Sequence, residues 1–273
     1  MHSSKPSFWN TFIAASAIVA AAALLPACSK SDKPAAAPTE LSVFAAASLT
    51  DVLAELAAPF EKTNDAKVVF NFAGSNTLAQ QIIAAPRVDV FLSASEKWMD
   101  SVEQAGDLAP GTRSSVLSNS LAVIAHPNSS YAMSAPEQIA GLDFRFLSLG
   151  DPDAVPAGRY AKQWLSALKS GQGTIWDAVK GRISPAPDVR AALGQVEGSE
   201  DVIGIVYMTD YASATGRVRL IYALPAAEGP KISYASAVLL EAPHPELARA
   251  FLAYLSSPEA KAIFKKHGFT ILN

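Results

Sequence analysis

The chain has 273 residues, which is enough for one large domain or for two lobes that each bury a core. Half of the residues are apolar and 17% are charged, a composition that is typical of a globular protein and excludes a disordered one. The formal net charge of −3 argues against nucleic acid as a partner, because nucleic-acid binding depends on clustered positive charge. An anionic ligand would therefore have to be held by local dipoles.

The first 27 residues have the pattern of an export signal. Lys5 precedes an apolar stretch from Phe12 to Leu25, and a small residue, Ala27, stands before Cys28. We therefore predict a signal peptide over residues 1–27.

Cys28 is the only cysteine of the chain, so no intramolecular disulfide can form. The run Leu25-Pro26-Ala27-Cys28 resembles a bacterial lipobox, which predicts that Cys28 is acylated and ties the protein to a membrane by its lipid alone. The alternative is plain secretion with an incidental cysteine near the cleavage point. Residues 28–40, rich in alanine, proline and serine, are predicted to be a flexible tether.

From Leu41 onward the hydrophobic pattern alternates between strands and helices, which predicts an α/β fold with mainly parallel sheets. The first unit is a buried strand around Val43 that runs through three alanines into a helix opened by Ser48. Ser48 stands where an N-cap residue belongs. A helix N-terminus at the carboxyl edge of a parallel sheet has free N–H groups and a positive dipole end, so it can hold an anion without a charged side chain.

Later elements follow the same alternation. Strands are predicted at 67–72, 88–92, 120–126, 144–149, 202–207, 218–222 and 232–239. Helices are predicted from Leu78 to before Pro86, over 95–104, from Pro136, around 160–168, from Asp188 and twice between 245 and 265. The strands near Ser120 and Ile232 are where we expect the chain to cross between two lobes through a hinge.

Four turns lead from a strand or a proline-marked loop into the start of a helix. They are Ala47-Ser48, Gly74-Ser75, Pro156-Ala157 and Asp188-Val189. Any one of them alone is an ordinary helix cap. Two lie in the first half of the chain and two in the second, so closure of two lobes would point all four at one cleft. Tyr207, at the end of a buried strand, would add a phenolic O–H donor.

Six segments resemble the periplasmic molybdate-binding proteins of ABC importers, in family order and from Leu41 to the C-terminus. They are Phe44-Ala45-Ala46-Ala47-Ser48-Leu49-Thr50, Phe72-Ala73-Gly74-Ser75-Asn76-Thr77-Leu78-Ala79, Gly150-Asp151-Pro152 with Val155-Pro156-Ala157-Gly158, Asp188-Val189-Arg190, Gly204-Ile205-Val206-Tyr207 and Gly268-Phe269-Thr270-Ile271. The resemblance implies a two-lobed periplasmic-binding-protein fold of the class II type, with lobe I at 41–119 and 233–273 and lobe II at 120–232.

The resemblance also implies a binding site and a function. The oxyanion is expected to be bound by Ser48 and Ser75 through hydroxyl and amide, by the backbone amides of Ala157 and Val189, and by the Tyr207 hydroxyl. The protein is expected to be a monomer that captures molybdate, and tungstate with it, and delivers it to an ABC permease. It would act without a cofactor and not as an enzyme, and no side chain would ligate a metal cation directly, because molybdenum is bound as the oxyanion.

The donor set agrees with this ligand, because molybdate is a fully deprotonated dianion at neutral pH and needs donors only. Sulfate, another tetrahedral oxyanion, would suit the same donors and remains an alternative. Phosphate would profit from a carboxylate that accepts its remaining proton. The candidates are Asp151, Asp153 and Asp188, which we interpret as turn or cap residues.

Two further chemistries are weaker alternatives. Tyr207 and Tyr211, with Asp210 as the acid, would suit a ferric ion. A serine hydrolase using Ser48 or Ser75 would lack a histidine partner. The histidines His126, His244 and His267 are scattered without metal-ligand spacing and are predicted to be surface or boundary residues.

Overall fold

The computed structural model describes residues 37–85 and 87–272. The predicted signal peptide, Cys28 and most of the predicted tether therefore lie outside the described residues. The first strand already begins at Thr39, so the last two residues predicted as tether belong to it. Within the described residues, no helix is both long enough and apolar enough to cross a membrane.

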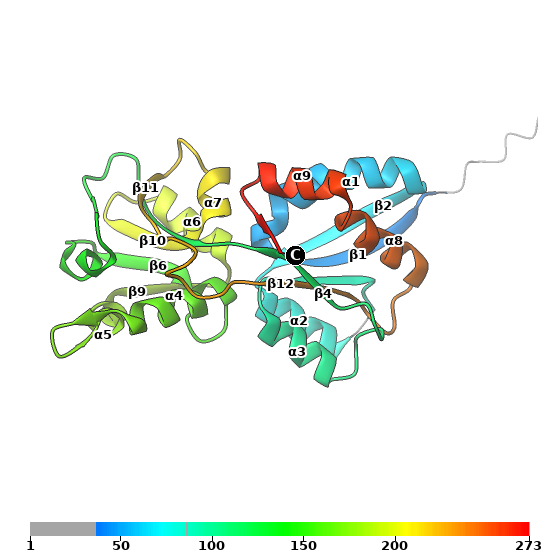
Figure 1. Cartoon of the computed structure of the whole chain (residues 1–273), viewed down its shortest axis with the longest axis horizontal. Coiled ribbons are helices and arrows are strands. Elements are labelled where there is room, and N and C mark those ends of the chain that lie inside the picture. The colour runs from blue at the N-terminus through cyan, green and yellow to red at the C-terminus, as the bar shows by residue number, and fades with distance from the viewer. Residues whose placement is uncertain (1–36, 86, 273) are drawn as a thin grey trace, which may run out of the picture. The chain divides into compact units, whose positions relative to one another are not determined.

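The first of two lobes, lobe I, is built on a six-stranded sheet with the order β13-β4-β12-β3-β1-β2. Its elements are β1 (Thr39–Ala46), η1 (Ala47–Leu49), α1 (Thr50–Asn64), β2 (Ala66–Ala73), α2 (Ser75–Ala84), β3 (Val90–Ser93), α3 (Glu96–Gln104), β4 (Ser114–Ser118), β12 (Tyr234–Val238), α8 (Pro245–Leu255), α9 (Pro258–Lys266) and β13 (Thr270–Ile271). Figure 1 shows α1 and α9 on one face of this sheet and α2 and α3 on the other.

Lobe II is built on a five-stranded sheet with the order β11-β5-β10-β6-β9. Its elements are β5 (Leu121–Ala125), η2 (Pro136–Gly141), β6 (Phe146–Gly150), α4 (Pro156–Ala167), the hairpin of β7 (Lys169–Ser170) and β8 (Gly173–Thr174), α5 (Ile175–Val179), η3 (Lys180–Arg182), β9 (Ile183–Ala186), α6 (Val189–Glu197), β10 (Val202–Tyr207), α7 (Met208–Ser213) and β11 (Arg219–Ala223). The chain passes from lobe I to lobe II between β4 and β5 and returns between β11 and β12 (Figure 1).

The α/β class is confirmed, but both sheets are mixed and not mainly parallel as expected. β1 pairs in parallel with β2 and β3, and β6 pairs in parallel with β9 and β10. The strands that carry the chain between the lobes are antiparallel to their neighbours: β12 to β3 and β4, and β5 to β10 and β11. The reason is the path of the chain, since β4 leaves lobe I beside β12, which returns to it.

The junction of β1 and α1 differs in one detail from the prediction. Ser48 is not an N-cap, because a 3-10 turn over Ala47–Leu49 precedes α1, whose N-cap position is Leu49 without a side-chain cap. The first helical residue, Thr50, bonds the Ala47 carbonyl through its own hydroxyl. The Ser48 side chain is therefore released for another partner.

Several elements were not predicted. β4, the β7–β8 hairpin, α5, α7, β9 and β13 are absent from the expected set, and the helix expected from Pro136 is a 3-10 helix. β9 contains Pro185, which was interpreted only as a helix blocker. It is accommodated because β9 is the edge strand of its sheet, where a missing N–H donor costs little.

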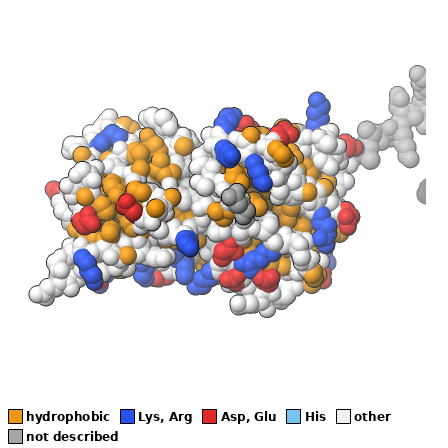
Figure 2. All heavy atoms as spheres, in the orientation of Figure 1, with side chains coloured by type: hydrophobic (Ala, Val, Ile, Leu, Met, Phe, Trp, Pro, Cys, Tyr) orange, Lys and Arg blue, Asp and Glu red, His pale blue; other side chains and the backbone are white. Residues whose placement is uncertain are grey.

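The mixture of acidic and basic residues in the composition is also seen on the surface of the described residues. The face seen in Figure 2 carries acidic and basic side chains interspersed among apolar ones and presents no continuous basic surface.

Candidate functional site

A small cavity lies where the two lobes meet. Its walls include all five residues predicted to bind the oxyanion: Ser48, Ser75, Ala157, Val189 and Tyr207. The two serines belong to lobe I and the other three residues to lobe II. The cavity is tight, since only about 10 Å³ of it is open to a water-sized sphere, close to the least volume that holds one water molecule.

The Ser75 hydroxyl lies at the start of α2. Gly74 is the N-cap residue, in extended conformation, and Ser75 is the first residue of the helix. Ser75 is buried, and its Oγ accepts a hydrogen bond from the Ala94 N–H at 3.0 Å. A backbone N–H can only donate, so the Ser75 proton stays available to another acceptor.

The lobe II donors come from two helix starts. Ala157 is the second residue of α4, which Pro156 opens, and Val189 is the first residue of α6. The predicted N-cap Asp188 is confirmed, because its Oδ1 accepts from the N–H groups of Arg190 and Ala191 at 2.8 and 2.9 Å. Asp188 does not accept from the first helical N–H of α6, which is that of Val189. Both helix starts carry the positive end of a helix dipole.

Tyr207, the last residue of β10, is only 1% exposed. Its hydroxyl is buried and has no hydrogen-bond partner among the described residues. Burial, above all, raises the pKa of Tyr207 well above its usual value, so the hydroxyl keeps its proton and is a donor. A buried donor without a partner is costly, which favours a ligand oxygen at this place.

Arg190, which follows the cavity-lining residue Val189, lies between two carboxylates. Arg190 Nε is 2.6 Å from Asp210 Oδ1, and Arg190 Nη2 is 2.7 Å from Asp51 Oδ2. Asp51 belongs to α1 of lobe I, so Arg190 also joins the two lobes. A second bond between the lobes runs from Trp98 Nε1 to the Ala154 carbonyl at 2.9 Å.

Asp210 is fully buried, and its burial raises its pKa to about 6, against the lowering effect of Arg190. Its Oδ2 accepts from the Tyr207 N–H at 3.2 Å. Both oxygens of this carboxylate are thus engaged, which leaves the ferric-ion alternative without its acid ligand. Among the described residues, no group of three His, Cys, Asp or Glu side chains stands where it could hold a metal ion.

The other carboxylates considered for a protonated anion form local bonds. Asp151 Oδ1 accepts from the N–H groups of Asp153 and Ala154, and Asp153 pairs with Lys162 at 2.6 Å. They are turn residues, as interpreted from the sequence.

The three histidines of the described residues, His126, His244 and His267, pair with carboxylates away from the cavity. His267 Nε2 lies 2.8 Å from Glu55, and His244 Nδ1 lies 3.5 Å from Asp89. None of the residues that line the cavity is a histidine, so neither serine has the base that a hydrolase needs.

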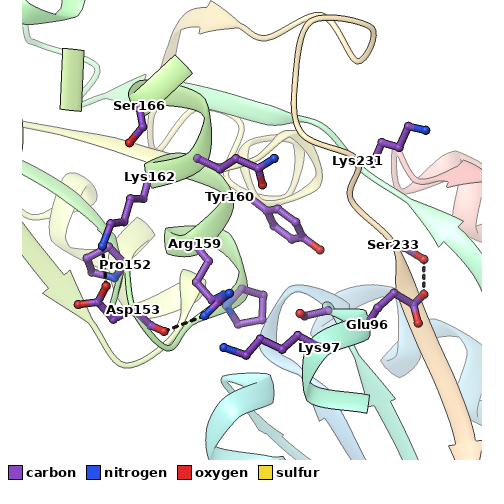
Figure 3. A pocket seen from close by; sticks show the side chains of 13 residues that line it. Glu96, Lys97, Pro152, Asp153, Arg159, Tyr160, Lys162, Ser166, Lys231 and Ser233 are labelled. Atoms are coloured by element: carbon purple, nitrogen blue, oxygen red, sulfur yellow. Dashed lines mark hydrogen bonds and ion pairs between the residues drawn. The ribbon is translucent and has the colours of Figure 1, made fainter. Parts of the chain in front are cut away.

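A larger hollow of about 560 Å³ lies beside the cavity and shares Pro156 with it. Four basic side chains line it: Lys97, Arg159, Lys162 and Lys231 (Figure 3). Its two carboxylates are already engaged, Asp153 with Lys162 and Glu96 with Arg113. We call this feature the basic hollow; it could not be predicted from the sequence, because its cations come from distant segments.

Two α/β lobes with a donor-lined cavity between them define a two-lobed periplasmic binding protein. Residues 41–270 match the family described as bacterial extracellular solute-binding protein, and the chain belongs to this family. It is 39% identical over 237 residues to the molybdate-binding protein ModA of Escherichia coli K12, covering 85% of this chain and 89% of the relative. It is 37% identical to ModA of Haemophilus influenzae, covering 86% of this chain and 91% of the relative.

Solved structures support the fold. The periplasmic molybdate-binding protein of Azotobacter vinelandii superposes with a TM-score of 0.75 at 24% identity, over 85% of this chain and all of that one. The sulfate-binding protein SubI of Mycobacterium tuberculosis also reaches 0.75, at 13% identity, over 86% of this chain and 88% of that one. At these identities the likeness concerns the fold alone.

Proposed function

We propose that this protein captures molybdate, and tungstate with it, between its two lobes and delivers it to an ABC permease. The observation that carries this proposal is the convergence of Ser48, Ser75, Ala157, Val189 and Tyr207 on one cavity. Its lining has one charged side chain, that of Asp188, which caps α6. The two ModA relatives, whose names state molybdate binding, support the choice of ligand.

The proposed mode of binding follows from the donors. Two serine hydroxyls, a tyrosine hydroxyl and the amides at helix starts surround an anion that carries no proton of its own. Lobe I, at 41–119 and 233–273, and lobe II, at 120–232, each supply part of the shell, so binding requires the lobes to close through the connecting segments. No bond of the ligand is broken, and binding needs no cofactor.

We further propose that the protein works outside the cytoplasm as a monomer. Residues 1–27 would direct export, and acylated Cys28 would hold the protein at a membrane by its lipid. Labelling with radioactive palmitate in the producing cell, with Cys28→Ser as the control, tests the anchor: label on the variant would refute it.

Sulfate is the second candidate, because it is also a tetrahedral dianion that needs donors only and because SubI has the same fold. A thermal-shift screen separates the two on protein lacking the predicted signal peptide. A ligand at 100 times its dissociation constant should stabilise the protein by about 2.7 kcal/mol. We expect this shift with molybdate and tungstate. A shift with sulfate alone would mean that the ligand is sulfate and not molybdate.

Calorimetry then tests the residues. Each hydrogen bond to a charged group is worth about 1.5–3 kcal/mol, so Ser48→Ala should weaken molybdate binding about 10- to 150-fold. Unchanged affinity in both Ser48→Ala and Ser75→Ala would refute the proposed site.

A further inference from the structure

A chain of hydrogen bonds leads from the cavity to the segment that joins the two lobes. Ser48 Oγ lies 3.0 Å from Tyr234 Oη, and Asn119 Nδ2 lies 3.2 Å from the same Tyr234 oxygen. Tyr234 begins β12 and Asn119 follows β4, so both stand beside the crossings between the lobes. Neither is among the residues that line the cavity. What matters for the ligand is the direction in which these bonds donate.

The direction is fixed at Asn119. Its Oδ1 accepts from the Ser120 N–H at 3.0 Å, and a backbone N–H can only donate. The other end of the amide is therefore Nδ2, which donates to Tyr234 Oη and to Thr209 Oγ1, the latter at 2.8 Å. Both protons of the Asn119 amide are engaged, and all three side chains are buried.

The direction of the bond from Asn119 also decides the direction of the next bond, between Tyr234 and Ser48. The Tyr234 oxygen accepts from Asn119, and burial keeps its hydroxyl protonated by raising its pKa. Among the described residues, Ser48 Oγ is the acceptor within reach of that proton. The opposite direction, Ser48 donating to Tyr234, would leave the buried Tyr234 proton without a partner, which is costly. Tyr234 therefore donates, and Ser48 Oγ accepts.

The result is that the Ser48 proton points to the cavity. Ser75 reaches the same state by a different route, because its oxygen accepts from the Ala94 N–H. Tyr207 adds a third free hydroxyl proton. The buried acceptor Asn76 Oδ1 has no partner among the described residues, but Asn76 is not one of the residues that line the cavity. The carboxylate of Asp188 does belong to the lining, and its Oδ1 already accepts from the Arg190 and Ala191 N–H groups.

We propose that Tyr234 and Asn119 are positioning residues that hold Ser48 as a hydrogen-bond donor to the ligand, and that this fixed direction makes the site select oxyanions that carry no proton. The inference rests on the proposed function and deepens it. Hydrogen phosphate has a proton to donate, whereas the hydroxyls of Ser48 and Ser75 turn their own protons toward the ligand. Molybdate and sulfate have no such proton.

Tyr234→Phe removes the hydroxyl and keeps the ring, which packs edge-on against Phe269 at 5.5 Å between centroids. Calorimetry on the full chain purified in detergent compares molybdate with phosphate. Molybdate affinity should fall about 2- to 12-fold, the equivalent of one ordinary hydrogen bond. The ratio of molybdate to phosphate affinity should fall as well, because the released Ser48 hydroxyl can turn and accept. A merely structural role would weaken both anions alike and leave the ratio unchanged.

Two further variants keep the test decisive. Asn119→Ala removes the donor that sets the direction of Tyr234 and should lower the same ratio. In a Ser48→Ala background, Tyr234→Phe should have no further effect on molybdate affinity, since the chain acts through Ser48. Tyr254→Phe is the matched control: the Tyr254 hydroxyl is buried without a partner among the described residues, and Tyr254 packs on Phe60, away from the cavity lining.

The outcomes separate this inference from the proposed function. An unchanged ratio in Tyr234→Phe and Asn119→Ala, with molybdate still bound by the wild type, overturns the inference alone. So does a Tyr234→Phe loss that persists in the Ser48→Ala background. A wild type that binds sulfate and not molybdate overturns the proposed function, and the same variants then test the inference with sulfate against phosphate. A wild type that binds no oxyanion overturns both.

Discussion

Gly74 lies where lobe I touches lobe II beside the cavity. A Cβ atom built at Gly74 would stand 2.7 Å from the Pro187 carbonyl oxygen and 2.6 Å from Asn76 Oδ1. Asn76 has a side chain that can turn away, whereas the Pro187 oxygen is backbone of the other lobe. The Gly74 backbone is extended, with φ −60° and ψ 136°, so an alanine there is unstrained within lobe I. Gly74→Ala therefore hinders lobe I and lobe II from coming into contact.

The size of the effect follows from the same distance. Ordinary contact of a Cβ atom begins at 3.4 Å, so the new methyl group has to move 0.7 Å from the Pro187 oxygen, the difference between 3.4 and 2.7 Å. That displacement would stretch lobe II hydrogen bonds from about 2.9 Å to roughly 3.6 Å, beyond the useful range. Tolerating the overlap instead costs about 1–3 kcal/mol, so molybdate affinity should fall about 5- to 150-fold.

Calorimetry with molybdate measures this loss, and thermal unfolding without ligand checks that the lobes still fold. Gly194→Ala is the matched control, because a Cβ at Gly194 meets open space and the residue lies within α6. The control should keep the wild-type affinity and gain about 0.5–1 kcal/mol of stability from its helix. A Gly74→Ala protein that binds molybdate as tightly as the wild type would refute the requirement for this lobe contact.

Three further predictions use other parts of the structure. Ser75→Ala should weaken molybdate binding about 10- to 150-fold and also lower the free energy of unfolding by about 1–3 kcal/mol, because the buried Ala94 N–H loses its acceptor; an unchanged melting temperature would contradict this. Because the pKa of Asp210 is about 6 when folded and 3.8 when exposed, the free energy of unfolding should fall by about 2 kcal/mol as the pH rises from 4 to 6, and Asp210→Asn should flatten that slope in urea titrations. Lys231→Gln in the basic hollow should slow molybdate association in stopped-flow measurements at low salt and not at about 1 M salt; an equal slowing at both would argue against electrostatic steering.

The parts of the fold and site that could be predicted are those with local causes. The strand at 202–207 was predicted with the observed bounds, because its residues form one continuous apolar run. Asp188 was predicted as an N-cap because a short acidic side chain after two prolines has few other roles. The candidate donors were found in the same way, as small residues at strand-to-helix turns.

The parts that could not be predicted depend on distance along the chain. Ser48 and Tyr234 are 186 residues apart, so nothing near Ser48 shows that its hydroxyl has a partner. Trp98 and Ala154 likewise meet only because the lobes do. The mixed sheets have the same origin, since strand direction at a crossing is set by where the chain returns.

The position of Arg190 explains why the proposed site uses dipoles for a doubly charged ligand. Arg190 follows Val189 directly, yet its guanidinium lies 2.7 Å from Asp51 and 2.6 Å from Asp210, so two carboxylates share one cation. Its charge is thereby compensated and is not left to attract anions of every kind. A lysine or arginine facing the cavity would need a counter-ion whenever the site was empty and would hold any anion that fitted. Hydroxyl and amide donors need no counter-ion, and because each bond has a direction, they distinguish an oxygen that accepts from one that carries a proton. Three cations of the basic hollow, Lys97, Arg159 and Lys231, have no carboxylate partner among the described residues and can then speed the encounter without deciding which anion stays.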